Sequence, residues 1–141
     1  MRGIECRGRC CTSGRWIFGH YVEHKARQSC PVDDDYGPDD ILHDIFISEY
    51  ADWNMPRQLK GIKVHPKTVG EYTGLKDKNG VKIFEGDILH DEDKTLGIVE
   101  FNKGRFVGDF DGRTYYSELY FDAEKSEVIG NIHDNPELRR E

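Results

Sequence analysis

Short apolar segments separated by turn dipeptides are the feature that most constrains this chain of 141 residues. Asn79-Gly80 stands between residues 72–75 and 81–84. Asn-Gly is the strongest short-range signal for a β-hairpin, because both residues tolerate positive φ. Asn102-Lys103-Gly104 separates 97–101 from 105–110 in the same way. Fifteen glycines scattered along the chain fit many turns between short strands, so the pattern predicts a mainly β protein.

The first half of the chain carries weaker strand signals. Residues 16–22 are rich in aromatic and β-branched side chains, and 61–65 form a further short strand that Pro66 stops. The segment 41–50 fits both helical spacing and strand alternation, and we favour the strand slightly. Residues 31–40 hold five aspartates and two prolines, which predicts an acidic loop.

The second half predicts a small barrel. After a turn at 85–87, strands are expected at 88–90, at 113–116 following Asp111-Gly112, and at 127–133. Five or six short strands at close spacing are typical of a curved, SH3-like sheet. We therefore predict an SH3-like β-barrel subdomain over 67–141, with an N-terminal β-rich subdomain over 1–66 packed on it.

Composition and charge narrow the classes of function. Hydrophobic residues make up 36% and charged residues 33%, but 11% aromatic content argues against disorder. The net charge of −7 disfavours non-specific binding of nucleic acid, which depends on neutralising phosphates. Only residues 1–30 are basic, with six Lys/Arg against two carboxylates.

The compartment is expected to be the cytoplasm of a bacterial cell. No stretch approaches the roughly 18–20 apolar residues that cross a bilayer, and the first residues lack the apolar core of a signal peptide. In that compartment the four cysteines are expected to be reduced.

Three ordered motifs resemble the YopX-like family of phage proteins. They are an Arg7-Gly8 opening with a Trp-containing strand, the segment 69–80 continued by 83–88, and the closing segment 128–138. The resemblance covers nearly the whole chain and implies a phage or prophage source and a β-rich fold with an SH3-like C-terminal part. It implies no activity, no cofactor and no catalytic residues, so we expect a protein that is not an enzyme.

Metal and catalytic sites are weakly supported. Cys6, Cys10, Cys11 and Cys30, with His20 and His24 between them, carry zinc-ligating groups, but the paired Cys-x2-Cys spacing of structural zinc sites is missing. The aspartates of 31–40 lack the alternating spacing of an EF-hand loop. Nothing in the sequence pairs a nucleophile with a histidine. No metal or catalytic residue is therefore assigned.

Two hypotheses of function remain. The leading one is a protein-binding or scaffolding module that binds a phage or host protein, or self-associates through sheet edges. Exposed aromatics among Tyr115, Tyr116, Tyr120 and Phe121 would suit such contacts. The alternative is an accessory protein that binds nucleic acid through basic residues interleaved with aromatics. Its candidate contacts are Arg7, Arg9, Arg15 and Trp16.

Overall fold

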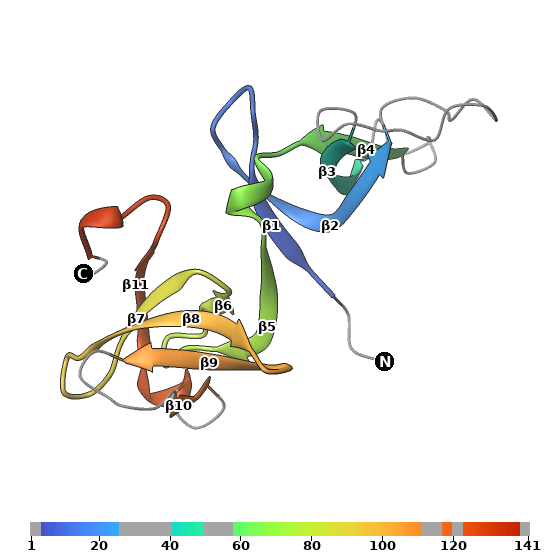
Figure 1. Ribbon diagram of the computed structural model, residues 1–141. Helices are drawn as coiled ribbons and strands as arrows, with labels where there is room; N and C mark the ends of the chain where they lie inside the picture. Colours follow the sequence, from blue (N-terminus) through green and yellow to red (C-terminus); the bar gives the residue numbers. More distant parts are fainter. Residues whose placement is uncertain (1–3, 26–40, 50–57, 111–116, 120–122, 139–141) are drawn as a thin grey trace. The chain divides into compact units, whose positions relative to one another are not determined.

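The computed structural model describes residues 4–25, 41–49, 58–110, 117–119 and 123–138 (Figure 1). The chain divides into two compact units, Met1–Val69 and Gly70–Glu141, and each is described by itself. Both units are built from short antiparallel strands. No helix among the described residues has the length and apolarity needed to cross a membrane.

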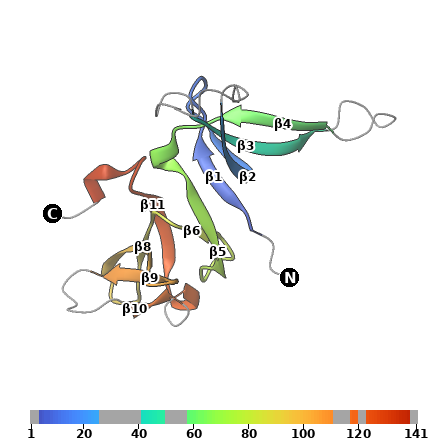
Figure 2. The same cartoon turned by 45° about the vertical axis from the view of Figure 1, so that its right-hand side comes forward.

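The first unit is a sheet in the order β4-β3-β2-β1, in which every neighbouring pair is antiparallel (Figure 2). Its strands are β1 (Cys6–Arg9), β2 (Trp16–Lys25), β3 (Ile41–Glu49) and β4 (Gln58–Lys63). A short 3-10 helix, η2 (Pro66–Thr68), follows β4, because Pro66 lacks the N–H that would continue the ladder.

The sheet of the first unit curls until the ends of β1 and β4 meet. Cys10 forms an isolated antiparallel bridge with Val64, and the His65 N–H donates to the Arg9 carbonyl at 2.9 Å. Ile45 and Val64 are fully buried on the concave side. Gly8 lies against both: a Cβ there would stand 3.0 Å from the Ile45 Cδ1 atom, so the absence of a side chain permits the curl.

The second unit begins with the hairpin of β5 (Gly70–Lys76) and β6 (Lys82–Phe84). Its turn is organised by Asp77, whose carbonyl accepts the Gly80 N–H and whose carboxylate accepts the N–H groups of Asn79 and Val81, both at 2.8 Å. Gly80 has φ of +80°. The hairpin expected at Asn79-Gly80 is confirmed, and within that pair only Gly80 occupies the positive-φ region.

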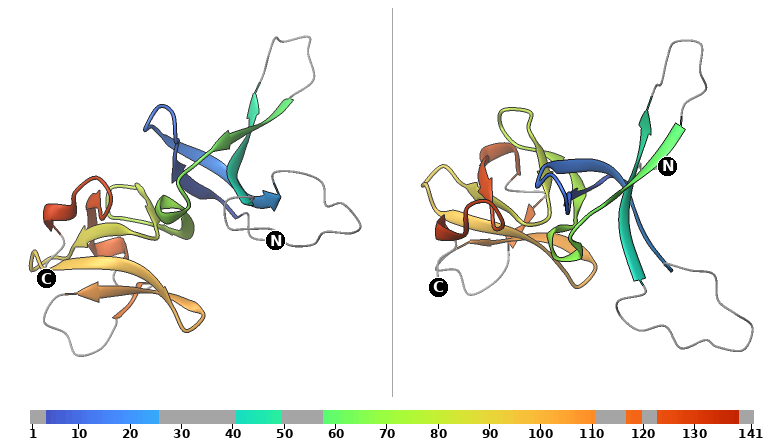
Figure 3. Two further views of the ribbon diagram at one scale, coloured as in Figure 1. Left: turned by 45° about the horizontal axis from the view of Figure 1, so that its top comes forward. Right: turned by 90° about the horizontal axis from the view of Figure 1, so that it is seen from above.

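A five-stranded antiparallel sheet completes the second unit, in the order β10-β9-β8-β7-β11 (Figure 3). Its strands are β7 (Asp87–His90), β8 (Leu96–Asn102), β9 (Arg105–Phe110), β10 (Ser117–Glu118) and β11 (Glu127–Asn131). The β8–β9 connection is a two-residue turn with positive φ at both Lys103 and Gly104. Such a turn matches the right-handed twist of the flanking strands.

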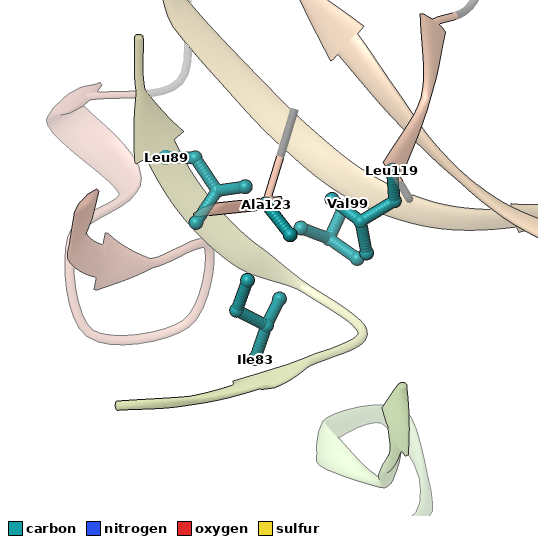
Figure 4. Close-up of a cluster of buried hydrophobic side chains, with 5 residues drawn as sticks. All are labelled: Ile83, Leu89, Val99, Leu119 and Ala123. Atoms are coloured by element: carbon teal, nitrogen blue, oxygen red, sulfur yellow. The ribbon is translucent and has the colours of Figure 1, made fainter. Parts of the chain in front are cut away.

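The core of the second unit is aliphatic. Five residues that are all at most 1% exposed pack together in Figure 4: Ile83, Leu89, Val99, Leu119 and Ala123. They come from β6, β7, β8, the residue directly after β10 and a 3-10 helix, η3 (Ala123–Lys125). Gly97 and Gly108 both leave room for the buried ring of Phe110, since a Cβ at either position would come within 2.6 Å of it.

The closing segment is a network of side-chain caps that ends in a 3-10 helix, η4 (Pro136–Leu138). The Asn131 side-chain oxygen accepts the N–H groups of His133 and Asp134, and the Asn135 side-chain oxygen accepts the N–H of Asn131. Asn135 lies over Gly130, where a Cβ would collide with its amide. This geometry explains physically why the motif needs Gly, Asn and Asn at these positions.

The strands expected at 16–22, 41–50, 61–65, 88–90 and 127–133 are confirmed, with shifted ends. The expected acidic loop at 31–40 and the strand at 113–116 lie outside the described residues. The mainly β class is confirmed, whereas closure of the second unit into an SH3-like barrel and the subdomain ranges 1–66 and 67–141 stay predictions.

Candidate binding face

The register of the first sheet separates its side chains into two faces. Residues that stand opposite each other in an antiparallel ladder point to the same side. Cys6, Gly8, Ile45 and Val64 therefore belong to the concave side, which we call the inner face. The other side, the outer face, carries the following strand residues: Arg7, Arg9, Trp16, Phe18, His20, Val22, His24, Leu42, Asp44, Phe46, Leu59, Gly61 and Lys63.

Trp16 anchors one end of the outer face beneath two arginines. Arg7 lies opposite Phe18 in the ladder and Arg9 lies opposite Trp16. Their guanidinium carbons stand 4.8 Å and 5.6 Å from the Trp16 ring centroid, which is cation–π geometry. Arg7 is only 8% exposed, so much of its side chain is committed to packing.

Three apolar side chains are exposed farther along the outer face. Phe18 is 48%, Val22 is 39% and Leu59 is 73% accessible. The Phe46 ring lies beside them over β4, because Gly61 has no Cβ: one built there would stand 3.0 Å from the Phe46 Cζ atom. The sheet thus presents aromatic and aliphatic groups side by side to solvent.

The charges on this face are mostly positive. Arg7, Arg9 and Lys63 carry permanent positive charges, and Asp44 is the carboxylate among the strand residues of the face that the structure describes. The Asp44 Oδ2 atom stands 2.6 Å from the His24 Nε2 atom, so this carboxylate already has a partner. The face is therefore cationic around an apolar centre.

The inner face has its own polar contact. The Tyr21 hydroxyl and the His43 Nδ1 atom are 2.6 Å apart, and their rings are stacked. Burial raises the pKa of Tyr21, helped by the nearby charge of Glu23. A hydrogen bond therefore joins the protonated phenol to the imidazole of His43.

The cysteines of the described part do not converge on a metal site. Cys6, Cys10 and Cys11 form no disulfide, and no three His, Cys, Asp or Glu side chains of the described residues are grouped to hold an ion. Cys30 lies outside those residues. Hydrogen bonds from Ser13 and Thr12 lower the pKa of Cys10 to about 6, and its sulfur stands 3.2 Å from the Thr12 hydroxyl.

The four candidate contacts from the sequence are partly brought together. Arg7, Arg9 and Trp16 share the outer face, whereas Arg15 is exposed in the turn that precedes β2. The sequence reasoning missed Val22, Phe46, Leu59 and Lys63. Alternation of Phe18, His20, Val22 and His24 along one strand could have indicated the face, but the contributions of β3 and β4 depend on a register that no local signal provides.

Aromatic residues of the second unit divide in two groups. Tyr115, Tyr116, Tyr120 and Phe121 lie outside the described residues. Phe101 and Phe106 stand opposite each other on the β8–β9 hairpin, with ring centroids 5.0 Å apart in an edge-to-face arrangement. Phe101 is largely exposed, which gives a matched reference site away from the first sheet.

Comparison with known proteins relates this architecture to one family. The family model described as "YopX protein" matches residues 11–139. Among solved structures, the chain is similar to protein EF1440 from Enterococcus faecalis, with 22% identity and a TM-score of 0.54, over 98% of this chain and 99% of that one. That likeness shows the fold alone. No curated protein matches the chain.

Proposed function

This chain belongs to the YopX protein family, and from its geometry we propose that it is a non-enzymatic protein-binding or scaffolding module that acts through the outer face of its first unit. The module is encoded by a phage or prophage and works in the cytoplasm of a bacterial host. Its partner is a phage protein, a host protein or a second copy of the chain.

One observation carries this proposal: Phe18, Val22 and Leu59 are exposed together on a single sheet face. Leaving large apolar groups in water forfeits about 25 cal/mol for each Å² that burial would remove. The outer face exposes three such side chains beside the half-buried Trp16 and Phe46. Covering it with a partner would therefore be favourable. Aromatic groups and arginine are also enriched at protein interfaces.

Nucleic acid binding is the second candidate, because Arg7, Arg9 and Trp16 do gather on the same face. Base stacking requires an open aromatic surface. The guanidinium groups occupy that surface of Trp16, and the chain carries a net charge of −7. Both facts favour a protein partner over a nucleic acid.

Two finer features complete the proposal. We propose that the second unit forms an SH3-like barrel, which is supported by its run of short antiparallel strands β7, β8 and β9. Self-association through sheet edges is a further route of assembly. An experimental structure and sedimentation at several concentrations test these two features.

The experiment for the main proposal compares three immobilised proteins in lysate of the bacterial host. They are the wild type, the double variant Phe18→Ser/Leu59→Ser, and Phe101→Ser as a control for loss of an exposed apolar group. We expect one identified partner to be retained by the wild type and the control and lost by the double variant. Equal retention by all three proteins, or a partner that is nucleic acid, would contradict the proposal.

A further inference from the structure

We infer that the outer face accepts an extended acidic protein segment that carries apolar anchor residues; this rests on the proposed function above. The inference names the chemistry of the partner, and it comes from the way charge and apolar surface alternate on the four strands.

Charge complementarity indicates the sign of the partner's charge. Lys63 is exposed and stands opposite Asp44 in the β3–β4 ladder, while Arg9 stands at the other end of the face. The His24 Nε2 atom stands 2.6 Å from the Asp44 Oδ2 atom, so a hydrogen bond already engages this carboxylate. Among the described strand residues of the face, the cations Arg7, Arg9 and Lys63 outnumber the Asp44 carboxylate, and this excess of positive charge attracts carboxylates and repels a basic segment.

The spacing of the exposed apolar side chains indicates the conformation of the partner segment. Phe18 and Val22 are four residues apart on β2, and a strand rises by about 3.3 Å per residue, so their side chains stand about 13 Å apart. An extended segment places apolar side chains at the same spacing when they occur four positions apart. A carboxylate before the first anchor would lie near Arg9, which is level with Trp16, and one beside the second anchor would lie near Lys63, which is level with Val22.

The same surface discriminates between the two classes of polyanion. Val22 and Leu59 supply exposed aliphatic groups, which have no ring on which a base can stack. Aliphatic side chains instead pack against apolar side chains of a peptide.

An array of short random peptides tests the inference with the full chain as the probe. We expect the bound peptides to be enriched in Asp or Glu together with Phe, Leu, Ile or Val, and their binding to weaken with added salt. Charge reversal by Lys63→Glu should reduce binding of the selected peptides about tenfold. Lys60→Glu makes the same charge reversal on the opposite face of the same strand and should keep the affinity for these peptides within about twofold of the wild type. Single-stranded oligo(dT) serves as the nucleic-acid probe.

The outcomes separate the two proposals. Enrichment of apolar peptides without acidic residues would overturn this inference and leave the protein-binding function standing. Preferential binding of oligo(dT) over every peptide would overturn both. Equal losses for Lys63→Glu and Lys60→Glu would also overturn the inference, because a non-specific charge effect would then account for the binding.

Discussion

The carboxylate of Asp77 accepts the backbone N–H of Val128 at 3.0 Å, although the two residues are 51 positions apart. This bond joins the turn of the β5–β6 hairpin to the bulged start of β11, where the register with β7 shifts. The two segments are the central and the closing motifs that identify the family in the sequence. Their distance in sequence and contact in space show that the motifs are one structural unit.

Replacing Asp77 with alanine should destabilise the second unit by about 3 kcal/mol, because three backbone N–H groups lose a charged acceptor at a buried position. Urea unfolding followed by fluorescence measures the loss. Asp109→Ala, which removes an exposed carboxylate from β9, is the matched control and should cost less than about 0.5 kcal/mol. Equal losses for the two variants would refute the structural role of Asp77.

Asp77 also predicts acid sensitivity. Burial alone would raise the pKa of Asp77, but the N–H groups of Val128, Val81 and Asn79 outweigh it and hold the pKa below the usual value. The stability it contributes is therefore complete above the unfolded-state pKa of about 3.9 and is lost as pH falls through the lower folded-state pKa. Stability measured against pH should fall less steeply below pH about 4 in Asp77→Asn than in the wild type.

Glu85 has the opposite sign and does not obscure this test. Burial raises the pKa of Glu85, so the ionised carboxylate is disfavoured in the folded state. This destabilisation decreases as pH falls and the carboxylate takes up a proton. Both proteins contain Glu85. The difference between their pH profiles therefore isolates Asp77, and superimposable profiles below pH about 4 would contradict the assignment.

Local patterns in the sequence were sufficient for the strands and several turns. Alternation and β-branched residues located β2, β3 and β11, and turn dipeptides located both hairpins of the second unit. What they could not provide was the pairing of strands distant in sequence. The bridge of Cys10 with Val64 and the bond of Asp77 with Val128 both span more than fifty residues, and no local pattern specifies such pairs.

The binding face was only partly predictable for the same reason. Arg7, Arg9 and Trp16 are close in sequence and belong to one hairpin, so their grouping could be anticipated. Leu59 and Lys63 join them only because β4 lies two strands away from β2 with a particular register. Shifting that register by one residue would turn both side chains to the inner face.

Gly130→Ala should destabilise the closing segment by about 2 kcal/mol, because the added methyl group would collide with the Asn135 amide that caps Asn131. A double-mutant cycle with Asn135→Ala tests the cause. In the Asn135→Ala background the methyl group has space, so the cost of Gly130→Ala should fall by at least about 0.5 kcal/mol. Additive costs would show that the two residues are not coupled.

Cys10 should exist largely as a thiolate at neutral pH, since hydrogen bonds from Ser13 and Thr12 lower its pKa to about 6. The ultraviolet absorbance of the thiolate, titrated in a Cys11→Ser background, should rise with a midpoint near this value. Ser13→Ala removes the strongest contribution and should move the midpoint toward the ordinary value of about 8.5. An unchanged midpoint in Ser13→Ala would contradict this account of the turn, and Cys10→Ser identifies the signal.

Phe18 and Ile45 lie on opposite faces of the same sheet, and their substitutions should separate binding from stability. Ile45→Ala removes a fully buried side chain from the inner face and should cost about 3 kcal/mol. Phe18→Ser changes a half-exposed side chain and should alter stability by no more than about 0.5 kcal/mol, because about half of the side chain is already exposed to water in the free protein. Thermal unfolding of the free protein measures both. A loss in Phe18→Ser as large as that in Ile45→Ala would place Phe18 in the core and remove the basis of the binding face.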